Sequence, residues 1–211
     1  MSTLFTVHYG EIALKGMNRR EFENTLVGNI EKSLSKKGKC SVKKKESRIL
    51  VEFEGREKDA EDILSKTFGV EWFSRAGKTG RKIEEMTKAA LKMAEPYRNL
   101  TLKVEAKRAD KKYPLTSPEI GRKIGLELEK KGFLTILRKP HEKIFVELLS
   151  DCALVSVGRK RAAGGLPLGT GGRVVSLLSG GIDSPVSSWL MMRRGCTTSL
   201  TMNTNHQSAS R

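Results

Sequence analysis

The sequence contains few cysteines, no long apolar run, and far fewer acidic than basic residues. A helix that spans a bilayer needs about 20 consecutive apolar residues, and no stretch of this chain approaches that length. The first residues also lack the leading basic patch and the long apolar segment of a signal peptide. These absences argue against a membrane or secreted protein and favour a cytoplasmic one.

The cysteines do not form a recognisable site. Cys40, Cys152 and Cys196 are odd in number and far apart, without Cys-x-x-Cys spacing. This arrangement argues against a disulfide framework and a structural zinc site, and it favours free thiols that behave as small hydrophobic residues. We expect no catalytic role for Cys196. We also expect no chemistry from the histidines, which lack ligand-like spacing: His8, His141 and His206.

What the chain has in excess is positive charge. It carries 40 Lys and Arg residues against 24 Asp and Glu, a formal net charge of +16. The basic residues are spread over the whole chain rather than confined to a tail. A folded protein with such an excess most often binds a polyanion, because each neutralised phosphate releases counterions. The alternative is a generally basic surface without a specific partner.

The first part of the sequence predicts a small α+β domain. Residues 4–9 read as a strand, and from Arg19 apolar side chains recur every four positions, as on one helix face: Phe22, Leu26, Ile30 and Leu34. Gly38 is placed to end that helix. Two strands (41–45 and 49–53) and a helix (60–68) follow. The order β-α-β-β-α-β predicts a ferredoxin-like domain over residues 1–76.

The rest of the chain predicts a second unit over residues 77–161 and the opening of a third. Helix 83–94 and strand 101–106 precede a helix with Ser117 as its cap and Pro118 at its first position. Strands follow at 134–137, 143–149 and 153–157. Residues 162–172, rich in Gly, Ala and Pro, read as a linker. The last part of the chain predicts a strand (173–178), a Gly-Gly loop, a helix (186–193) and a strand near 200–202. A parallel sheet needs several more βα units than these to bury both of its faces. Residues 173–211 are therefore predicted to be the opening of an incomplete parallel-sheet domain.

The sharpest chemical signal is the loop Ser-Gly-Gly-Ile-Asp-Ser at residues 179–184, between an apolar strand and a helix. The glycines allow a tight turn and let backbone amides approach a ligand. The helix that follows adds free N–H donors and a partial positive charge, which suit a phosphate. The loop is not a Walker A motif, because the Gly-Lys-Ser/Thr ending is missing. The alternative is a plain turn in which Asp183 caps the helix.

This loop resembles the pyrophosphate-binding loop of N-type ATP pyrophosphatases, which adenylate a carbonyl oxygen and release pyrophosphate. Three further segments are similar to the tRNA 4-thiouridine synthase (tRNA sulfurtransferase) family: residues 10–16 with 18–20, residues 107–111 with 117–120, and residues 163–170. The four matches occur in order over essentially the whole chain. The family layout is a ferredoxin-like domain, an RNA-binding THUMP domain, and an ATP-pyrophosphatase (PP-loop) domain, which together make an α+β and α/β multidomain protein.

The resemblance implies an enzyme that uses ATP to activate a uridine of tRNA and then replaces its carbonyl oxygen with sulfur from a cysteine desulfurase. It also leaves open a sulfur-carrier role in thiamine thiazole synthesis, and a homodimer. Carried over by motif, Asp183 is the essential loop carboxylate and would hold Mg²⁺ against the phosphates. The ATP-binding residues implied are Leu177, Leu178, Ser179, Gly180, Gly181, Ser184, Met202 and Asn203.

The tRNA would bind the basic residues of the second unit, whose domain type holds the acceptor end in the resembled family. The candidates are Lys107, Arg108, Lys111, Lys112, Arg122 and Lys123, and Tyr113 could stack on a base. Weaker candidates in the first unit are Lys15, Arg19 and Arg20. We expect Trp72 and Phe73 to pack between domains. The competing hypothesis is a non-catalytic tRNA-binding module, although such a module has no reason to carry the loop.

Overall fold

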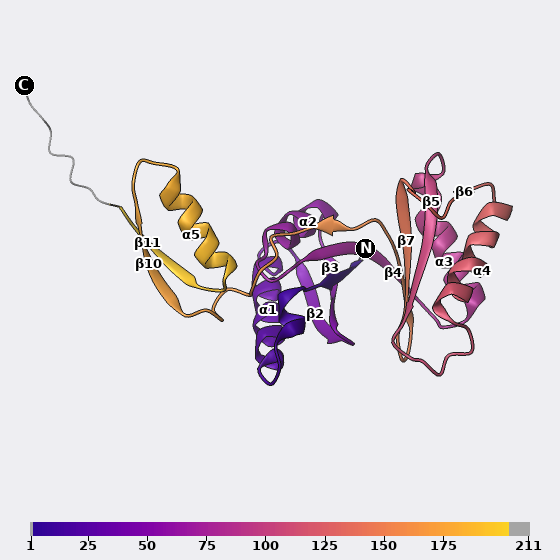
Figure 1. Cartoon of the computed structure of the whole chain (residues 1–211), viewed down its shortest axis with the longest axis horizontal. Helices are drawn as coiled ribbons and strands as arrows, with labels where there is room; N and C mark the ends of the chain where they lie inside the picture. Colours follow the sequence, from indigo (N-terminus) through magenta and orange to yellow (C-terminus); the bar gives the residue numbers. More distant parts are fainter. Residues whose placement is uncertain (1, 203–211) are drawn as a thin grey trace, which may run out of the picture.

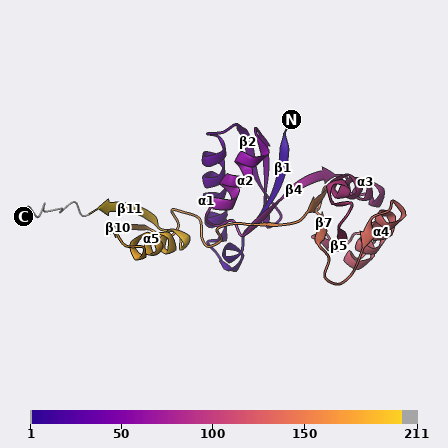
Figure 2. The same ribbon diagram turned by 90° about the horizontal axis from the view of Figure 1, so that it is seen from above.

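The structure is a computed structural model that describes residues 2–202. Three units follow one another along the long axis of the molecule, with the N-terminal unit in the middle (Figure 1). The second unit lies at one end and the third at the other, so the chain crosses the middle unit to connect them (Figure 2). Among the described residues, no helix combines the length and the apolar character that a membrane crossing requires.

The N-terminal unit has the predicted ferredoxin-like order. Its elements are β1 (Thr3–His8), α1 (Arg19–Leu34), β2 (Lys39–Lys45), β3 (Arg48–Glu54), α2 (Glu57–Lys66) and β4 (Trp72–Thr79), with a short 3-10 helix, η1 (Glu11–Leu14). The strands form the antiparallel order β2-β3-β1-β4. The four apolar residues predicted on one face of α1 are all buried: Phe22, Leu26, Ile30 and Leu34. The hydrophobic period therefore predicted both the helix and its packing face.

The second unit continues the same sheet. It contains α3 (Ile83–Ala94), η2 (Glu95–Tyr97), β5 (Thr101–Arg108), α4 (Ser117–Lys130), β6 (Leu134–Thr135), β7 (Glu142–Leu148), β8 (Ala153–Val157) and β9 (Lys160–Arg161). Strand β4 pairs with β1 through its first part and with β8 through its last, so the two units share one strand. The predicted boundary at residue 76 falls inside β4. Each unit keeps its own hydrophobic core.

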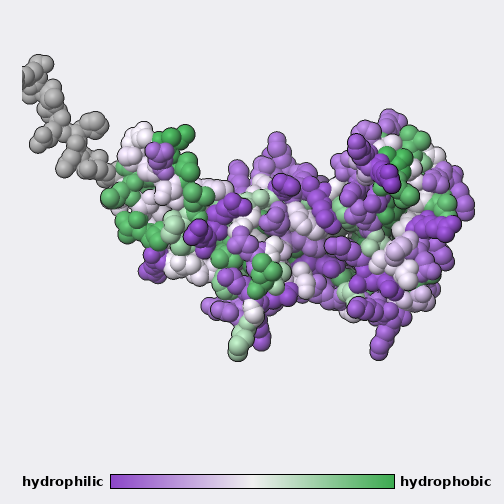
Figure 3. All heavy atoms as spheres, in the orientation of Figure 1, coloured by the Kyte–Doolittle hydropathy of each residue, from purple (hydrophilic) through white to green (hydrophobic). Residues whose placement is uncertain are grey.

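The third unit consists of β10 (Arg173–Leu178), α5 (Asp183–Arg193) and β11 (Thr197–Met202), and its two strands are parallel, as predicted. The sheet is largely uncovered, since Val175, Leu177 and Leu200 are 72%, 71% and 57% exposed. On the face seen in Figure 3, hydrophobic residues gather on this unit, whereas the other two are largely hydrophilic.

Three helix starts differ from the prediction, and α2 begins at Glu57 and ends at Lys66 rather than covering residues 60–68. The N-cap of α4 is Thr116, not Ser117: its side chain accepts a hydrogen bond from the Glu119 amide, and Glu119 binds back to the Thr116 amide. This capping box outcompetes a lone serine because it satisfies two free amides at once. Helix α5 begins at Asp183 rather than at Val186, because Pro185 lies in the first turn, where a helix tolerates proline.

Candidate functional site

The loop between β10 and α5 is organised by serine side chains. The Ser179 amide donates to Ser184 Oγ over 3.0 Å, and the two hydroxyls lie 3.2 Å apart. One turn further, Ser188 Oγ donates to the Ser184 carbonyl over 2.7 Å, so Ser176 donates to Ser188 Oγ over 2.6 Å. Ser188 is buried, whereas the loop is exposed. The strand and the helix are thereby tied together beneath an open loop.

The two loop glycines leave space rather than make the turn. Neither Gly180 nor Gly181 has a positive φ, so the loop conformation itself does not require glycine. A Cβ at Gly180 would meet no heavy atom within 4 Å, and one at Gly181 would meet only Ser179 Oγ, at 3.7 Å. The missing side chains therefore open the approach to the backbone amides, which suits a phosphate-sized ligand.

Asp183 is exposed in the first turn of α5 and does not cap the helix. The N-cap position is Ile182, and no side chain caps this helix terminus through a hydrogen bond. The capping alternative is therefore wrong for this residue. A carboxylate at a helix N-terminus is electrostatically favoured. Apart from that interaction, the Asp183 side chain has no capping role in α5.

The strand ends predicted to contact ATP lie next to this loop. Leu178 of β10 is in register with Met202 of β11, and Leu177 with Thr201, so the carboxyl ends of both strands meet at one edge. In open α/β sheets, ligands bind at this edge. Leu177 is exposed, and Asn203 lies outside the described residues.

A magnesium ion fits this loop only together with a phosphate ligand. Among residues 2–202, no three His, Cys, Asp or Glu side chains gather into a metal site. Asp183 and the serine hydroxyls supply hard oxygen donors, and Mg²⁺ is commonly held by one or two carboxylates plus substrate phosphates. The donor set is therefore consistent with a cation that arrives with its nucleotide.

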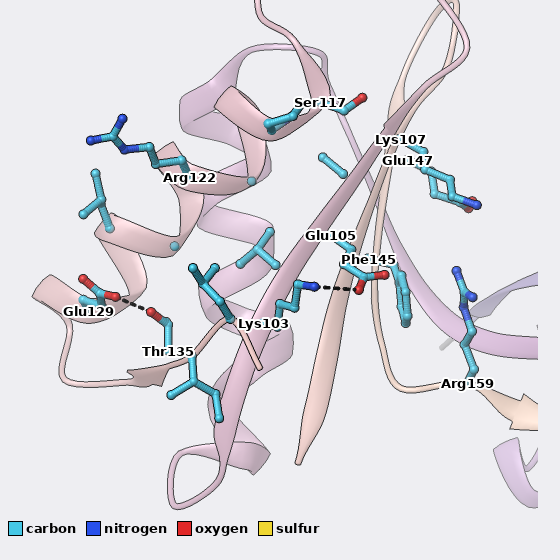
Figure 4. Close-up of a pocket in the computed structure, with 18 residues that line it drawn as sticks. Lys103, Glu105, Lys107, Ser117, Arg122, Glu129, Thr135, Phe145, Glu147 and Arg159 are labelled. Carbon is cyan, nitrogen blue, oxygen red and sulfur yellow. Dashed lines mark hydrogen bonds and ion pairs between the residues drawn. The ribbon is translucent and has the colours of Figure 1, made fainter. Parts of the chain in front are cut away.

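The second site is a cavity of about 870 Å³ in the second unit (Figure 4). It lies between β5 and α4, and the end of β6 with the two residues after it (135–137) closes one side. Strand β6 pairs only with Thr101 and Leu102, which leaves the rest of that β5 edge without a strand partner. Helix α4 approaches the edge at Gly121, where a Cβ would lie 3.2 Å from the Val104 carbonyl oxygen. The cavity therefore follows an open strand edge.

The cavity has an apolar floor and a basic rim. Lys107 extends from the far end of β5, and Arg122 from α4 (Figure 4). Lys103 lies 3.3 Å from Glu105, and Lys143 lies 2.7 Å from the same carboxylate. The hydrogen bond from Lys143 holds the pKa of Glu105 below its usual value, so this acid stays charged. Apolar side chains complete the lining: Leu126, Ile136, Leu137 and Phe145.

The predicted RNA-binding residues divide into several groups. Lys107 and Arg122 line the cavity, whereas Arg108 donates to the carbonyls of Tyr113 and Leu115 and so holds the loop after β5. Tyr113 donates its hydroxyl to the Arg81 carbonyl. The remaining candidates are exposed and do not line the cavity: Lys111, Lys112 and Lys123. The expected single basic face is thus split between a groove and a loop.

The weaker candidates of the first unit are partly used inside it. Arg19 donates to Glu23 over 2.8 Å and to Ser47 over 2.9 Å. Lys15 lies over the Phe22 ring, whereas Arg20 is exposed. These contacts leave Arg20 as the basic side chain of this segment that reaches solvent most freely.

Sequence reasoning missed Arg159, which also lines the cavity. Its guanidinium lies 4.0 Å from the Trp72 ring centroid and 3.7 Å from that of Phe145. Trp72 also stacks on His8 and lies at the junction as expected, whereas Phe73 is buried in the core of the first unit and does not pack between the units. Arg159 is far in sequence from Trp72 and from the strand β5 that lines the cavity, so no local sequence pattern indicated its position. Glycines four apart within α4, Gly121 and Gly125, were the one hint of the groove.

Three family models match the chain in order. The ThiI ferredoxin-like domain covers residues 4–74, the THUMP domain residues 80–158, and the thiamine biosynthesis protein (ThiI) model residues 169–211. The probable tRNA sulfurtransferase of Thermoanaerobacter sp. strain X514 is 40% identical over 197 residues, which are 92% of this chain and 52% of that protein. The relative from Staphylococcus aureus strain RF122 is also 40% identical, over 90% of this chain and 48% of its own length. The chain thus spans about half the length of these curated relatives.

Solved structures give the same result. The chain is similar to PH1313 from Pyrococcus horikoshii, with a TM-score of 0.85 and 28% identity over 95% of this chain and 68% of that one. It is also similar to a 4-thiouridine synthetase solved as an RNA complex with bound ATP, with a TM-score of 0.80 and 35% identity over 96% of this chain and 53% of that one. Fold and loop together define a THUMP protein with a PP-loop segment. The chain belongs to the tRNA sulfurtransferase (4-thiouridine synthase) family.

Proposed function

We propose that this chain binds tRNA and forms part of an ATP-dependent tRNA sulfurtransferase that makes 4-thiouridine. The observation that carries the proposal is the open Ser179–Ser184 loop, whose glycines leave room above helix-terminal amides, in the same chain as a basic THUMP groove. A similar synthetase was solved with both RNA and ATP, which supports assigning one ligand to each site. A reaction on tRNA would take place in the cytoplasm.

In this proposal the loop holds ATP by its phosphates. Ser179 and Ser184 hydroxyls and the α5 amides would bind the pyrophosphate portion, with Leu177, Leu178, Met202 and Asn203 beside the nucleotide at the strand ends. Asp183 would hold Mg²⁺, which supplies charge neutralisation where negative charge develops. Attack of the uridine carbonyl oxygen on the α-phosphate would release pyrophosphate. The terminal sulfur of a persulfide supplied by a cysteine desulfurase would then attack the activated carbon and displace AMP, and a thiol would cleave the resulting disulfide to leave 4-thiouridine. A persulfide of the same kind could serve thiazole synthesis.

The groove would hold the tRNA. Lys107 and Arg122 would contact phosphates, and the exposed lysines of the loop and of α4 would add to the attraction: Lys111, Lys112 and Lys123. Arg108 would act indirectly, because its guanidinium holds the loop that presents two of these lysines. Base stacking by Tyr113 is less favoured, since its hydroxyl is anchored to Arg81.

The test uses an extended protein, in which residue 211 is followed by the C-terminal half of the Thermoanaerobacter relative. We expect Asp183→Ala to abolish 4-thiouridine formation, with a loss of about 3–4 kcal/mol or more of transition-state stabilisation, and to leave tRNA affinity nearly unchanged. Calorimetric titration with Mg-ATP should show weak binding to the 211-residue chain, whose described β10–β11 sheet is uncovered, and tight binding to the extended protein. Unchanged thiolation in Asp183→Ala would contradict the proposal.

If wild type and variant bind tRNA equally and neither thiolates it, the result favours the alternative hypothesis of a non-catalytic tRNA-binding module.

A further inference from the structure

Residues 162–172, predicted as a linker, are bound to the first unit by backbone hydrogen bonds. The Ala162 amide donates to the Glu71 carbonyl over 3.0 Å, and the Gly164 amide donates to the Val70 carbonyl over 2.7 Å. The Gly69 amide donates back to the Gly164 carbonyl over 2.8 Å. These bonds extend the antiparallel pairing of β9 with the start of β4. The segment therefore begins as an ordered extension of the sheet.

Side chains strengthen this attachment. Ala162 and Leu166 pack against the hydrophobic core of the ferredoxin-like unit, and Pro167 is buried. Asn29 on α1 donates through Nδ2 to the Leu168 carbonyl over 3.0 Å. A flexible linker would expose its apolar side chains and leave its backbone to water. In this segment Leu168 is exposed, but the other apolar side chains are wholly or partly buried and several backbone groups are hydrogen-bonded.

The second half of the segment binds the C-terminal end of α5 and Gly195, which follows the helix. The Leu166 amide donates to the Arg193 carbonyl over 2.9 Å, and the amides of Gly169 and Gly171 both donate to the Gly195 carbonyl, over 2.8 and 2.9 Å. Carbonyls at a helix C-terminus have no partner within the helix, so the bond from Leu166 satisfies the otherwise open Arg193 carbonyl. The same segment thus joins the first unit to the helix that follows the Ser179–Ser184 loop.

Gly165 lies where the segment and α5 come closest. Its φ is +74°, and a Cβ there would lie 2.2 Å from the Arg193 carbonyl oxygen and 2.6 Å from Arg193 Cγ. Real Cβ atoms do not approach a backbone oxygen so closely, so any other residue would push α5 away from the segment. A second contact between the units lies nearby, where the rings of Phe68 and Trp189 are 5.8 Å apart.

We propose that residues 162–172 are a brace that fixes the β10–α5–β11 unit against the ferredoxin-like unit, and that Gly165 is a positioning residue for thiolation. The brace begins directly after β9, three residues beyond Arg159 of the THUMP groove, and ends at β10, which leads into the loop (Figure 2). It therefore fixes the orientation of the loop relative to the units that would hold RNA. The positioning role rests on the proposed function, whereas the brace itself does not.

The experiment compares two glycine variants of the brace. Gly165→Ala introduces both a strained positive φ and the clash with Arg193. Gly169→Ala introduces a similar strain at φ +97°, but its Cβ would meet no heavy atom within 4 Å. Any difference between the two variants therefore reports the contact with α5 and not the cost of alanine at positive φ. Asn29→Ala, which removes one bond to the brace without a clash, serves if Gly165→Ala does not fold.

The first readout needs no activity. In the 211-residue chain, the amides of Leu166, Gly169 and Gly171 should be protected from hydrogen exchange, and Gly165→Ala should accelerate their exchange by about tenfold or more relative to Gly169→Ala. Unprotected amides in the wild-type chain, or equal acceleration in both variants, would overturn the brace.

The second readout is thiolation kinetics in the extended protein. Gly165→Ala should lower kcat by up to about 100-fold, as expected when reacting groups are misplaced, and should leave the KM values for tRNA and Mg-ATP within about twofold. Gly169→Ala should stay near wild type. An unchanged kcat in an active Gly165→Ala protein would overturn the positioning role alone. Absence of 4-thiouridine from the wild-type extended protein would overturn the proposed function and leave the exchange result to judge the brace.

Discussion

His8 lies at the junction of the first two units, within a cluster that no local sequence pattern reveals. Its Nε2 is 3.4 Å from a carboxylate oxygen of Glu147 on β7, and its ring stacks on Trp72. Arg48 on β3 lies 3.5 Å from the same carboxylate, and Arg159 stands nearby. Burial lowers the pKa of His8, although the carboxylate opposes that shift. Burial alone would raise the pKa of Glu147, but His8 and the arginine charges outweigh it and hold that pKa below its usual value.

Both shifts predict that acid destabilises the chain. A histidine whose pKa is lower in the folded state binds its proton more readily when unfolded, so the stability it contributes is present above the unfolded pKa of about 6.5 and is lost as the pH falls through the folded value. Glu147 acts in the same direction from about pH 4.3 downwards. We expect the free energy of unfolding in urea to decrease from pH 7 to pH 5.

His8→Phe tests this residue directly. Phenylalanine keeps an aromatic ring against Trp72 and removes the titrating group, so the decline between pH 7 and pH 5 should become shallower, whatever the absolute stability of the variant. The comparison therefore concerns the slope of unfolding free energy against pH and not its level. An identical slope in wild type and His8→Phe would show that other groups cause the acid sensitivity.

At the scale of elements, α4 offers a matched pair of glycines. Gly125 faces the groove and has open space, whereas a Cβ at Gly121 would press on the Val104 carbonyl oxygen at 3.2 Å. Glycine inside a helix costs roughly 0.5–1 kcal/mol relative to alanine. Gly125→Ala should therefore stabilise the chain by about that amount, and Gly121→Ala should gain less or lose stability. Urea unfolding of both variants checks this, and equal gains would mean that α4 can move away from β5.

The same elements show what periodicity can predict. The four-residue repeat in α1 and the β-α-β-β-α-β order gave the correct core face and strand order, because both follow from local patterns. The segment 162–172 contains no helix or strand, as a linker would, but its contacts with both neighbouring units left no local pattern. Its glycine-rich composition predicted a linker, but Gly165 allows a close approach to α5 that only the tertiary structure shows. The groove was missed likewise, since its lining comes from β5, α4 and the distant Arg159.

The site loop falls between these cases. Its position after an apolar strand and before a helix was legible in the sequence, and the structure has that order. The role of its glycines was not predicted correctly. The sequence suggested that they allow a tight turn, but neither Gly180 nor Gly181 has a positive φ. Local sequence therefore located the loop correctly, while the open space that makes it a candidate phosphate site depends on what does not pack against it.

At the scale of the whole molecule, the net charge of +16 predicts tRNA binding that depends strongly on salt. Each phosphate that a basic side chain neutralises adds about 0.9 to the slope of log affinity against log salt for a duplex. Exposed basic residues occur in the groove, in the loop after β5 and in the first unit, so several such contacts should contribute. Filter binding of tRNA to the 211-residue chain from low to moderate salt measures this slope. An affinity that stays constant over that range would remove the electrostatic argument.

Lys107 and Arg108 are neighbours in the sequence, but we expect the first to affect RNA binding and the second to affect stability. Lys107 is exposed at the groove, so Lys107→Ala should reduce the salt slope by about one, weaken binding to all tRNAs alike and leave the unfolding free energy unchanged. Arg108 spends its guanidinium on the Tyr113 and Leu115 carbonyls, over 2.9 and 2.7 Å. Arg108→Ala should therefore cost roughly 1.5–3 kcal/mol of stability, because hydrogen bonds from a charged group are lost. The salt slope of tRNA binding should therefore change in Lys107→Ala, and the free energy of unfolding in urea should change in Arg108→Ala. A lower slope in Arg108→Ala at unchanged stability would show that this guanidinium leaves its carbonyls to bind RNA.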